Sequence, residues 1–173
     1  MQNFLVMTLI GKDRTGLVES ISRIIEDHGG NWLESRMCRL GGEFAGILRV
    51  YVPGEKEAAL IRSLQELDSR GLTVITRPDD VRPPAEQKKT AVLSLIGSDR
   101  PGIIRQVSAI LAHQSINVEE LETECSSAPM SGEMIFQASA KLQIPNSCAI
   151  SELRRELEAI GSEMMVEISF TET

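Results

Sequence analysis

Apolar residues along this chain follow two spacings, one typical of strands and one typical of helices. The segments NFLVMTLIG at 3–11 and TAVLSLIG at 90–97 are continuous runs rich in branched side chains, which predict strands. Each run is followed by apolar residues three or four positions apart, which predict a helix. These helical residues are Leu17, Ile21, Ile24 and Ile25 after the first run and Ile103, Val107, Ile110 and Leu111 after the second.

Both halves of the chain then continue in the same order. Two strands joined by a turn are predicted at 32–40 and 43–52, and again at 118–125 and 133–144. A second helix and a closing strand follow, at 55–70 and 72–76 in the first half and at 147–160 and 164–170 in the second. The order β-α-β-β-α-β, found twice, predicts an α+β protein of two tandem ferredoxin-like domains, with helices on one face of each antiparallel sheet.

Strand alternation predicts which side chains are buried. The candidates for the buried face are Leu48, Val50 and Val52 in the first half and Met134, Phe136 and Ala138 in the second. Cys38 and Cys125 also fall within strands, and we expect them to be buried small apolar residues rather than nucleophiles.

A run of glutamates, VEELETE at 118–124, is the most acidic segment of the second half. Such a run could bind a cation. Alternation instead places Glu120, Glu122 and Glu124 on one face of a strand, which we expect to be solvated.

The turn between the first strand and the first helix has nearly the same sequence in both halves. IGKDRTG at 10–16 matches IGSDRPG at 96–102 at an offset of 86 residues, and the match extends to Asn31 and Asn117. The offset is 90 where GEF at 42–44 meets GEM at 132–134, and again where Gly71 meets Gly161. Two copies are too few for a solenoid and predict a tandem pair of domains.

The division between the copies is marked by composition. The stretch RPDDVRPPAEQKK at 77–89 is polar and contains three prolines, which is typical of a linker. We expect a first domain at 1–78, a linker at 79–89 and a second domain at 90–173.

The repeated turn has a chemistry of its own. Asp13 and Asp99 suit the N-cap of the helix, and Pro101 suits its first turn. Gly16 and Gly102 leave backbone amides uncovered at a helix start, which favours a bound carboxylate or phosphate. Capping accounts for the aspartates and glycines but not for Arg14 and Arg100. Each arginine could clamp a carboxylate or pair with a glutamate on a neighbouring helix.

Asn31 and Asn117 begin the strand after the first helix of each copy. An asparagine side chain offers both a hydrogen-bond donor and an acceptor to a ligand. The alternative is that each asparagine only serves the turn, since it tolerates a left-handed backbone.

Composition excludes several classes of function. The chain has 18 Lys and Arg against 25 Asp and Glu, a net charge of −7, and neither half is basic. We therefore expect no direct contact with nucleic acid and no membrane surface as partner. The longest apolar runs are strand-sized, and the N-terminus lacks the basic start of a signal peptide. Three widely spaced cysteines are consistent with reduced thiols in a cytoplasmic protein.

No enzyme active site is evident in the sequence. The two histidines, His28 and His113, are not equivalent in the repeat, and no Gly-x-Gly-x-x-Gly or phosphate-loop motif occurs. No cysteine pair has metal-ligand spacing. We expect a protein that is not an enzyme and has no cofactor and no metal.

The β-α-β-β-α-β unit with D-R-x-G entering its first helix resembles the ACT domain, over both halves of the chain. N-x-x-x-S-R at 31–36 and L-G-G-E-F at 40–44 more narrowly resemble the glycine cleavage system transcriptional repressor family, which consists of two such domains. The second copy departs from this pattern, because VEELET follows Asn117 and Thr123 stands where the arginine is expected.

The resemblance implies a regulatory protein that binds a small ligand, an amino acid, beside the loop between the first strand and first helix. The residues implied are Asp13, Arg14, Gly16 and Asn31, and Asp99, Arg100, Gly102 and Asn117. It also implies action through a protein partner such as a transcription factor, and we expect a homo-oligomer. The alternatives are a regulatory subunit that docks on an enzyme of amino-acid metabolism and an interaction module without a ligand.

Overall fold

The computed structural model describes residues 2–79, 89–129 and 132–172. The chain divides into two compact units, Met1–Arg82 and Pro83–Thr173. Of the predicted linker 79–89, residues 80–88 lie outside the described residues. Residues 77 and 78, counted with the linker by composition, belong to the last strand of the first domain, and Lys89 already belongs to the first strand of the second.

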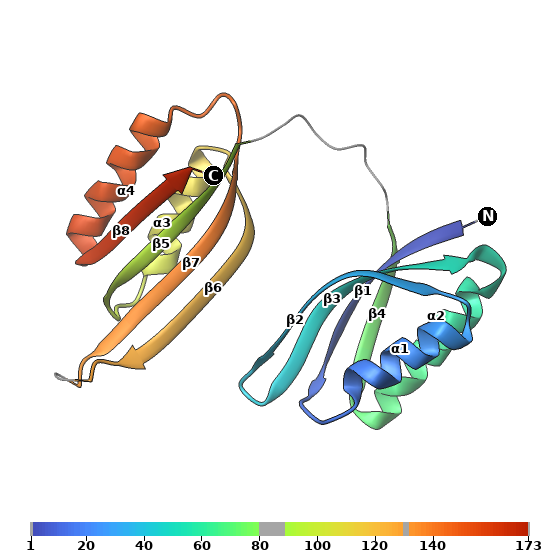
Figure 1. Cartoon of the computed structure of the whole chain (residues 1–173). Helices are drawn as coiled ribbons and strands as arrows, with labels where there is room; N and C mark the ends of the chain where they lie inside the picture. The colour runs from blue at the N-terminus through green and yellow to red at the C-terminus, as the bar shows by residue number, and fades with distance from the viewer. Residues whose placement is uncertain (1, 80–88, 130–131, 173) are drawn as a thin grey trace. The chain divides into compact units, whose positions relative to one another are not determined.

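The two domains have the same order of elements (Figure 1). The first domain consists of β1 (Gln2–Lys12), α1 (Leu17–Asp27), β2 (Asn31–Leu40), β3 (Glu43–Pro53), the 3-10 turn η1 (Gly54–Lys56), α2 (Glu57–Gln65), the 3-10 turn η2 (Glu66–Arg70) and β4 (Leu72–Pro78). The second consists of β5 (Lys89–Ser98), α3 (Ile103–His113), β6 (Asn117–Ser127), β7 (Met134–Ile144), α4 (Ile150–Met164) and β8 (Val166–Glu172).

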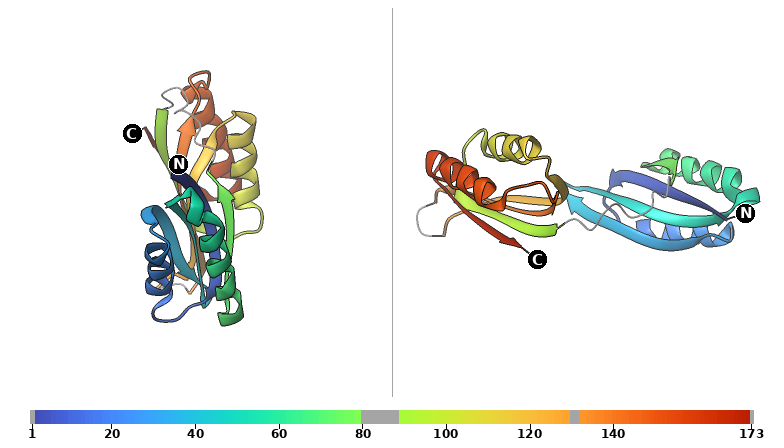
Figure 2. Two further views of the ribbon diagram at one scale, coloured as in Figure 1. Left: turned by 90° about the vertical axis from the view of Figure 1, so that its right-hand side faces the viewer. Right: turned by 90° about the horizontal axis from the view of Figure 1, so that it is seen from above.

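Each domain is a four-stranded antiparallel sheet with its two helices on one face (Figure 1). Figure 2 shows the same two layers from further directions. The strand orders are β2-β3-β1-β4 and β6-β7-β5-β8. The first strand of each domain therefore lies between the third and the fourth, which is the ferredoxin-like arrangement and confirms the predicted fold class.

A separate apolar core fills the space between helices and sheet in each domain. In the first domain Leu5, Met7 and Leu9 of β1 and Leu48, Val50 and Val52 of β3 are almost fully buried. In the second, Phe136 and Ala138 are buried as predicted. Met134 is exposed, contrary to prediction, because it pairs with Ser127 at the far end of the hairpin and lies beyond the helices.

The register corrects the alignment of the two copies. Phe44 pairs with Gly11 and Phe136 pairs with Gly97, so the equivalent of Phe44 is Phe136 and not Met134. The predicted match of Gly71 with Gly161 is also wrong. Leu72 pairs with Gly11 and Val166 with Gly97, so Met165 occupies the position of Gly71.

The edge strands β2 and β6 correct two further expectations and confirm one. Cys38 on β2 and Cys125 on β6 are exposed, contrary to the expectation that they are buried. Glu120, Glu122 and Glu124 are exposed as predicted. Arg36 pairs with Ile47 and Glu122 with Ser139, and the two partners both pair with the middle of the first strand. Glu122, not Thr123, is therefore the equivalent of Arg36.

Candidate ligand-binding site

Each first helix begins at a glycine and has no side-chain cap. Gly16 is the N-cap of α1 and Gly102 is the N-cap of α3, with φ of 90° and 99°. The predicted N-cap roles of Asp13 and Asp99 are therefore wrong. The chain enters each helix through a left-handed residue, which glycine adopts without the steric cost of a Cβ atom. Contrary to expectation, Pro101 precedes the N-cap and lies outside the first turn.

The space outside these helix starts is open. A Cβ atom built on Gly16 or Gly102 would meet no heavy atom within 4 Å. The Gly16 carbonyl accepts hydrogen bonds from the Ser20 backbone N–H at 2.9 Å and the Ser20 hydroxyl at 2.8 Å, which fixes the first turn. The first amides of a helix have no partner inside the helix and carry partial positive charge, so each start is suited to an anion.

Asp13 holds the turn against the hairpin of β2 and β3. Its carboxylate accepts from Arg39 Nε at 2.9 Å, and its backbone N–H donates to the Gly42 carbonyl at 3.0 Å. In the second domain the Asp99 N–H donates to the Met134 carbonyl at 2.9 Å. These contacts make the aspartates anchors of the loop that carries Arg14 and Arg100.

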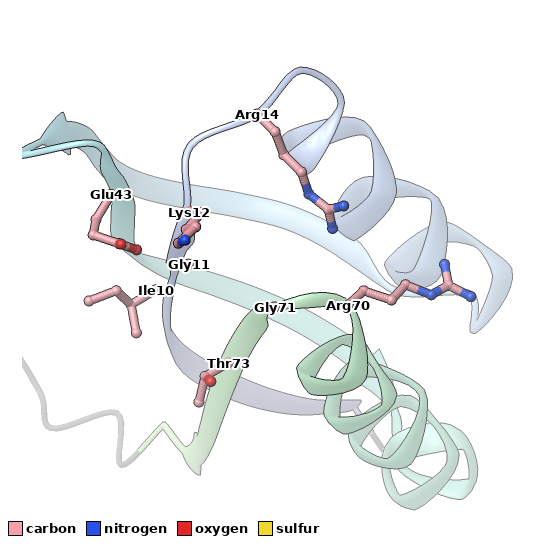
Figure 3. Close-up of a pocket in the computed structure, with 8 residues that line it drawn as sticks. All are labelled: Ile10, Gly11, Lys12, Arg14, Glu43, Arg70, Gly71 and Thr73. Atoms are coloured by element: carbon pink, nitrogen blue, oxygen red, sulfur yellow. The ribbon is translucent and has the colours of Figure 1, made fainter.

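Arg14 lines three hollows at this end of the first domain, and Arg70 also lines two of them. One, of about 640 Å³, is lined by Ile10, Gly11, Lys12, Arg14, Glu43, Arg70, Gly71 and Thr73 (Figure 3). The second, of about 300 Å³, is lined by residues of the turn and the start of α1, and again by Arg14 and Arg70. Figure 3 shows the two arginines coming from different elements, the loop before α1 and the end of η2.

Two glycines allow the strands to approach closely at this end. A Cβ atom on Gly11 would clash with the Gly71 carbonyl oxygen. Gly71 itself has φ of 77° and ends η2 in the left-handed conformation. Because neither residue carries a side chain, neither takes up space in the hollow that both line.

The hollow in the first domain is rich in cations. Lys12, Arg14 and Arg70 line it, against the single carboxylate of Glu43. Arg70 and Lys12 were missed by the sequence reasoning. The repeat drew attention to Gly71, through its match with Gly161, and not to the arginine before it.

The second domain has a different arrangement at the same place. Met165 replaces Gly71, and Arg100 Nη2 lies 3.7 Å from its Sδ atom. By the same register, Ser98 replaces Lys12 and Met164 replaces Arg70. The nearby hollow of about 420 Å³ is lined by Glu158 and Glu167 and contains no lysine or arginine. The second site therefore has one cation where the first has three.

The structure brings together only some of the predicted site residues. Asp13, Arg14 and Gly16 adjoin one another, as do Asp99, Arg100 and Gly102. Asn31 pairs with Tyr51, whereas Gly11 pairs with Phe44 at the site. Tyr51 is seven positions from Phe44 along β3, about 23 Å at the rise of a strand. Asn117, opposite Gln143, is likewise at the far end of its own sheet.

Other chemistry-bearing side chains are dispersed. Among residues 2–79, 89–129 and 132–172, no three His, Cys, Asp or Glu side chains are grouped so that they could hold a metal ion. Burial, together with the negative charges of Glu152 and Glu156, raises the pKa of the Cys148 thiol.

No helix in the described part of the chain is long and apolar enough to cross a membrane.

Comparison with known proteins agrees with the fold. Residues 3–76 match the family model of the ACT domain, and the second domain repeats its fold. The chain therefore belongs to the ACT-domain proteins. It is 25% identical over 166 residues to the glycine cleavage system transcriptional repressor of Escherichia coli strain K12, covering 94% of this chain and 86% of that protein.

Three further proteins are similar either to one domain or to the whole chain. The UPF0237 protein MK1213 of Methanopyrus kandleri is 30% identical over 78 residues, which cover 45% of this chain and 81% of that protein. The crystal structure of an unknown protein from Galdieria sulphuraria is 30% identical, with a TM-score of 0.88 over 100% of this chain and 99% of that one. A putative glycine cleavage system transcriptional repressor, 18% identical with a TM-score of 0.72, shares the fold over 100% of this chain and 98% of its own.

Proposed function

We propose that this chain is a non-catalytic regulator that binds an amino acid and acts through a protein partner to control transcription of the glycine cleavage system. The ACT-domain match and the likeness to the Escherichia coli repressor over 94% of the chain support the class of function. The ligand and the partner are inferred from the chemistry of the first domain and from the charge of the chain.

The observation that carries the proposal is the uncapped start of α1 beside Arg14 and Arg70. An amino acid always carries a carboxylate, which the helix amides and a guanidinium group bind by charge-assisted hydrogen bonds. Glu43 lines the adjoining hollow and can accept from the ligand's ammonium group. Hollows of about 300–640 Å³ accommodate a molecule of this size.

Not every predicted residue has the same part in this proposal. In the first domain Arg14 and Gly16 contact the carboxylate, and Asp13 positions the loop through Arg39. Arg100 and Gly102 form a weaker second site, with Asp99 as its anchor. Asn31 and Asn117 stay predictions, because each lies at the far end of its own sheet from the helix start.

A protein partner, rather than DNA, is favoured by electrostatics. The net charge is −7, and a protein that grips DNA neutralises phosphates with Lys and Arg. A cytoplasmic protein without membrane contact fits the same charge and the three cysteines. The second candidate, a regulatory subunit of an amino-acid metabolic enzyme, shares the ligand site and differs only in the partner.

Thermal unfolding of the full chain with each of the twenty amino acids tests the proposal. A ligand at roughly ten times its Kd stabilises by about 1.4 kcal/mol, which raises the melting temperature of a domain of this size by about 6–11 °C. The shift should disappear in Arg14→Ala and persist in Arg100→Ala. If no amino acid at about 10 mM moves the melting temperature, the proposed binding of an amino acid is wrong. An interaction module without a ligand is then the remaining alternative.

Affinity capture from cell extract, with the identified amino acid present, distinguishes the two candidate partners, a transcription factor and a metabolic enzyme. Recovery of a DNA-binding regulator supports transcriptional control. Recovery of a metabolic enzyme supports the regulatory subunit instead.

A further inference from the structure

The larger hollow at the end of the first sheet carries more positive charge than a neutral amino acid can balance. Lys12, Arg14 and Arg70 line it against Glu43, which leaves two positive charges in excess. An amino acid with an uncharged side chain has one carboxylate and one ammonium group at neutral pH, and therefore no net charge. Binding such a molecule would leave both excess charges unbalanced, and like charges held close together repel one another.

The protein does not neutralise these three cations itself. Within the part of the chain that the structure describes, the side chains of Lys12, Arg14 and Arg70 form no ion pair. Arg39 in the neighbouring hairpin does form one, with Asp13 at 2.9 Å. The positive charge around the hollow is therefore available to a bound anion.

The second domain shows that the fold does not require these charges. The register places uncharged residues at three of the four charged positions, namely Ser98 for Lys12, Ile135 for Glu43 and Met164 for Arg70. The fourth position keeps its charge, as Arg100. Charges that the architecture does not need, gathered around one hollow, indicate a ligand that needs them.

The two arginines also line a second, smaller space. Arg14 and Arg70 both border the hollow of about 300 Å³ at the start of α1. Figure 3 shows their side chains extending in the same direction from two elements, whereas Lys12 and Glu43 lie beside one another as a cross-strand pair. The two guanidinium groups thus line the same space, with Lys12 and Glu43 at the strand ends next to it.

We propose that the ligand of the first domain is an amino acid with a carboxylate on its side chain, aspartate or glutamate, and that Arg70 and Lys12 select it. The inference rests on the proposed function, which assigns the ligand's first carboxylate to Arg14 and its ammonium group to Glu43. Arg70 is then the guanidinium group left for a second carboxylate, which it can bind with two parallel hydrogen bonds. Lys12 adds positive charge on the same side.

The same arrangement disfavours two other kinds of amino acid. Glycine has no side chain and leaves Arg70 and Lys12 without a partner. Glutamine and asparagine match the acids in size and can accept a hydrogen bond, but their amides carry no charge. A hydrogen bond between charged groups is roughly twice as strong as one between neutral groups, so the acid should bind more tightly than its amide.

Isothermal titration calorimetry of the full chain tests the inference, with glutamate, aspartate, glutamine, asparagine and glycine as ligands. The buffer should contain no phosphate, which would compete for a cationic site. We expect at least one acid to bind about tenfold or more tightly than its own amide and than glycine. Glutarate, which lacks the ammonium group, should bind about tenfold or more weakly than glutamate.

The variants replace each cation with its counterpart in the second domain. Arg70→Met should largely abolish the preference for the acid over its amide, and Lys12→Ser should reduce it in part. The matched control is Arg62→Met, which removes an exposed arginine of α2 that lines neither hollow, and it should keep the full preference. All three positions are exposed, and circular dichroism checks that each variant remains folded.

The possible failures are distinguishable from one another. An amide or glycine that binds as tightly as the acid would overturn this inference and leave an amino-acid sensor of another specificity. A preference that survives in Arg70→Met, or that is lost equally in Arg62→Met, would overturn the role of Arg70. Glutarate that binds as tightly as glutamate, or no binding by any amino acid at about 10 mM, would contradict the proposed function itself.

Discussion

Arg100 Nη2 lies 3.7 Å from Met165 Sδ in the second domain, at the place where the first domain has Gly71 beside Arg14. The two copies of the loop thus have the same backbone and different surroundings. A guanidinium group against a thioether has lost part of its open space, whereas Arg14 faces a hollow shared with Arg70 and Lys12. This difference predicts that one chain binds one ligand with high affinity.

Removing Arg70 should weaken ligand binding without unfolding the protein. Arg70→Ala takes one of three cations from the hollow, and a hydrogen bond between charged groups contributes about 1.5–3 kcal/mol, so the Kd should rise about tenfold or more. Isothermal titration calorimetry with the amino acid found by thermal shift measures this. Arg62→Ala, which removes an arginine from α2 away from the hollow, is the control and should leave the Kd unchanged. An unchanged Kd in Arg70→Ala would exclude the hollow as the site.

The glycines at the site should respond differently to alanine. Gly11→Ala forces a Cβ atom into the Gly71 carbonyl between two paired strands, and overpacking of this kind costs about 1–3 kcal/mol of unfolding free energy. Gly16→Ala meets no neighbour and costs only the left-handed conformation, about 1–2 kcal/mol. Urea denaturation measures both. A Gly11→Ala protein as stable as the parent would show that β1 and β4 are not in close contact there.

The cysteines should react at different rates. Cys38 and Cys125 are exposed, whereas burial together with the charges of Glu152 and Glu156 raises the pKa of Cys148. Because the thiolate is the reactive form, a raised pKa leaves less of it at pH 8, and Cys148 should be alkylated last. Timed iodoacetamide labelling followed by peptide mass spectrometry gives the order. Labelling of Cys148 at the rate of Cys38 would contradict the partial burial of the Cys148 thiol.

Each domain should fold alone. The two cores share no residue, and each is enclosed by its own two helices and sheet. A fragment of residues 1–79 should therefore give a cooperative thermal transition and retain the ligand response of the full chain. The fragment 89–173 is the matched comparison and should unfold cooperatively without that response. A fragment 1–79 without a transition would show that the first core is incomplete.

Much of the fold follows from the sequence because its pattern is local. Branched apolar runs, helical spacing and the repeated turn determine all eight strands and the order of the elements. The sequence alignment of the two copies fails at the hairpin between β6 and β7, because its loop differs in length from that of the first copy. The alignment matches Phe44 with Met134, whereas strand pairing matches Phe44 with Phe136. Only strand pairing, a long-range property, corrects this shift.

The candidate site was predicted in part for the same reason. Arg14 and Gly16 lie within one short loop, so the sequence shows them together. Arg70 is far along the chain and reaches the loop only because β4 pairs beside β1 at Gly11. The N-cap was wrongly assigned to Asp13 because composition does not reveal that the chain turns through a left-handed glycine first.

The most direct test of the central claim is a two-dimensional ¹H–¹⁵N NMR titration of the full chain with the amino acid that stabilises it most. The account predicts shifts in the amide signals of Gly16, Leu17 and Val18 that saturate at one equivalent, while those of Gly102 and Ile103 stay unchanged until a large excess. Unmoved signals at Gly16, or signals at Gly102 that move first, would contradict it.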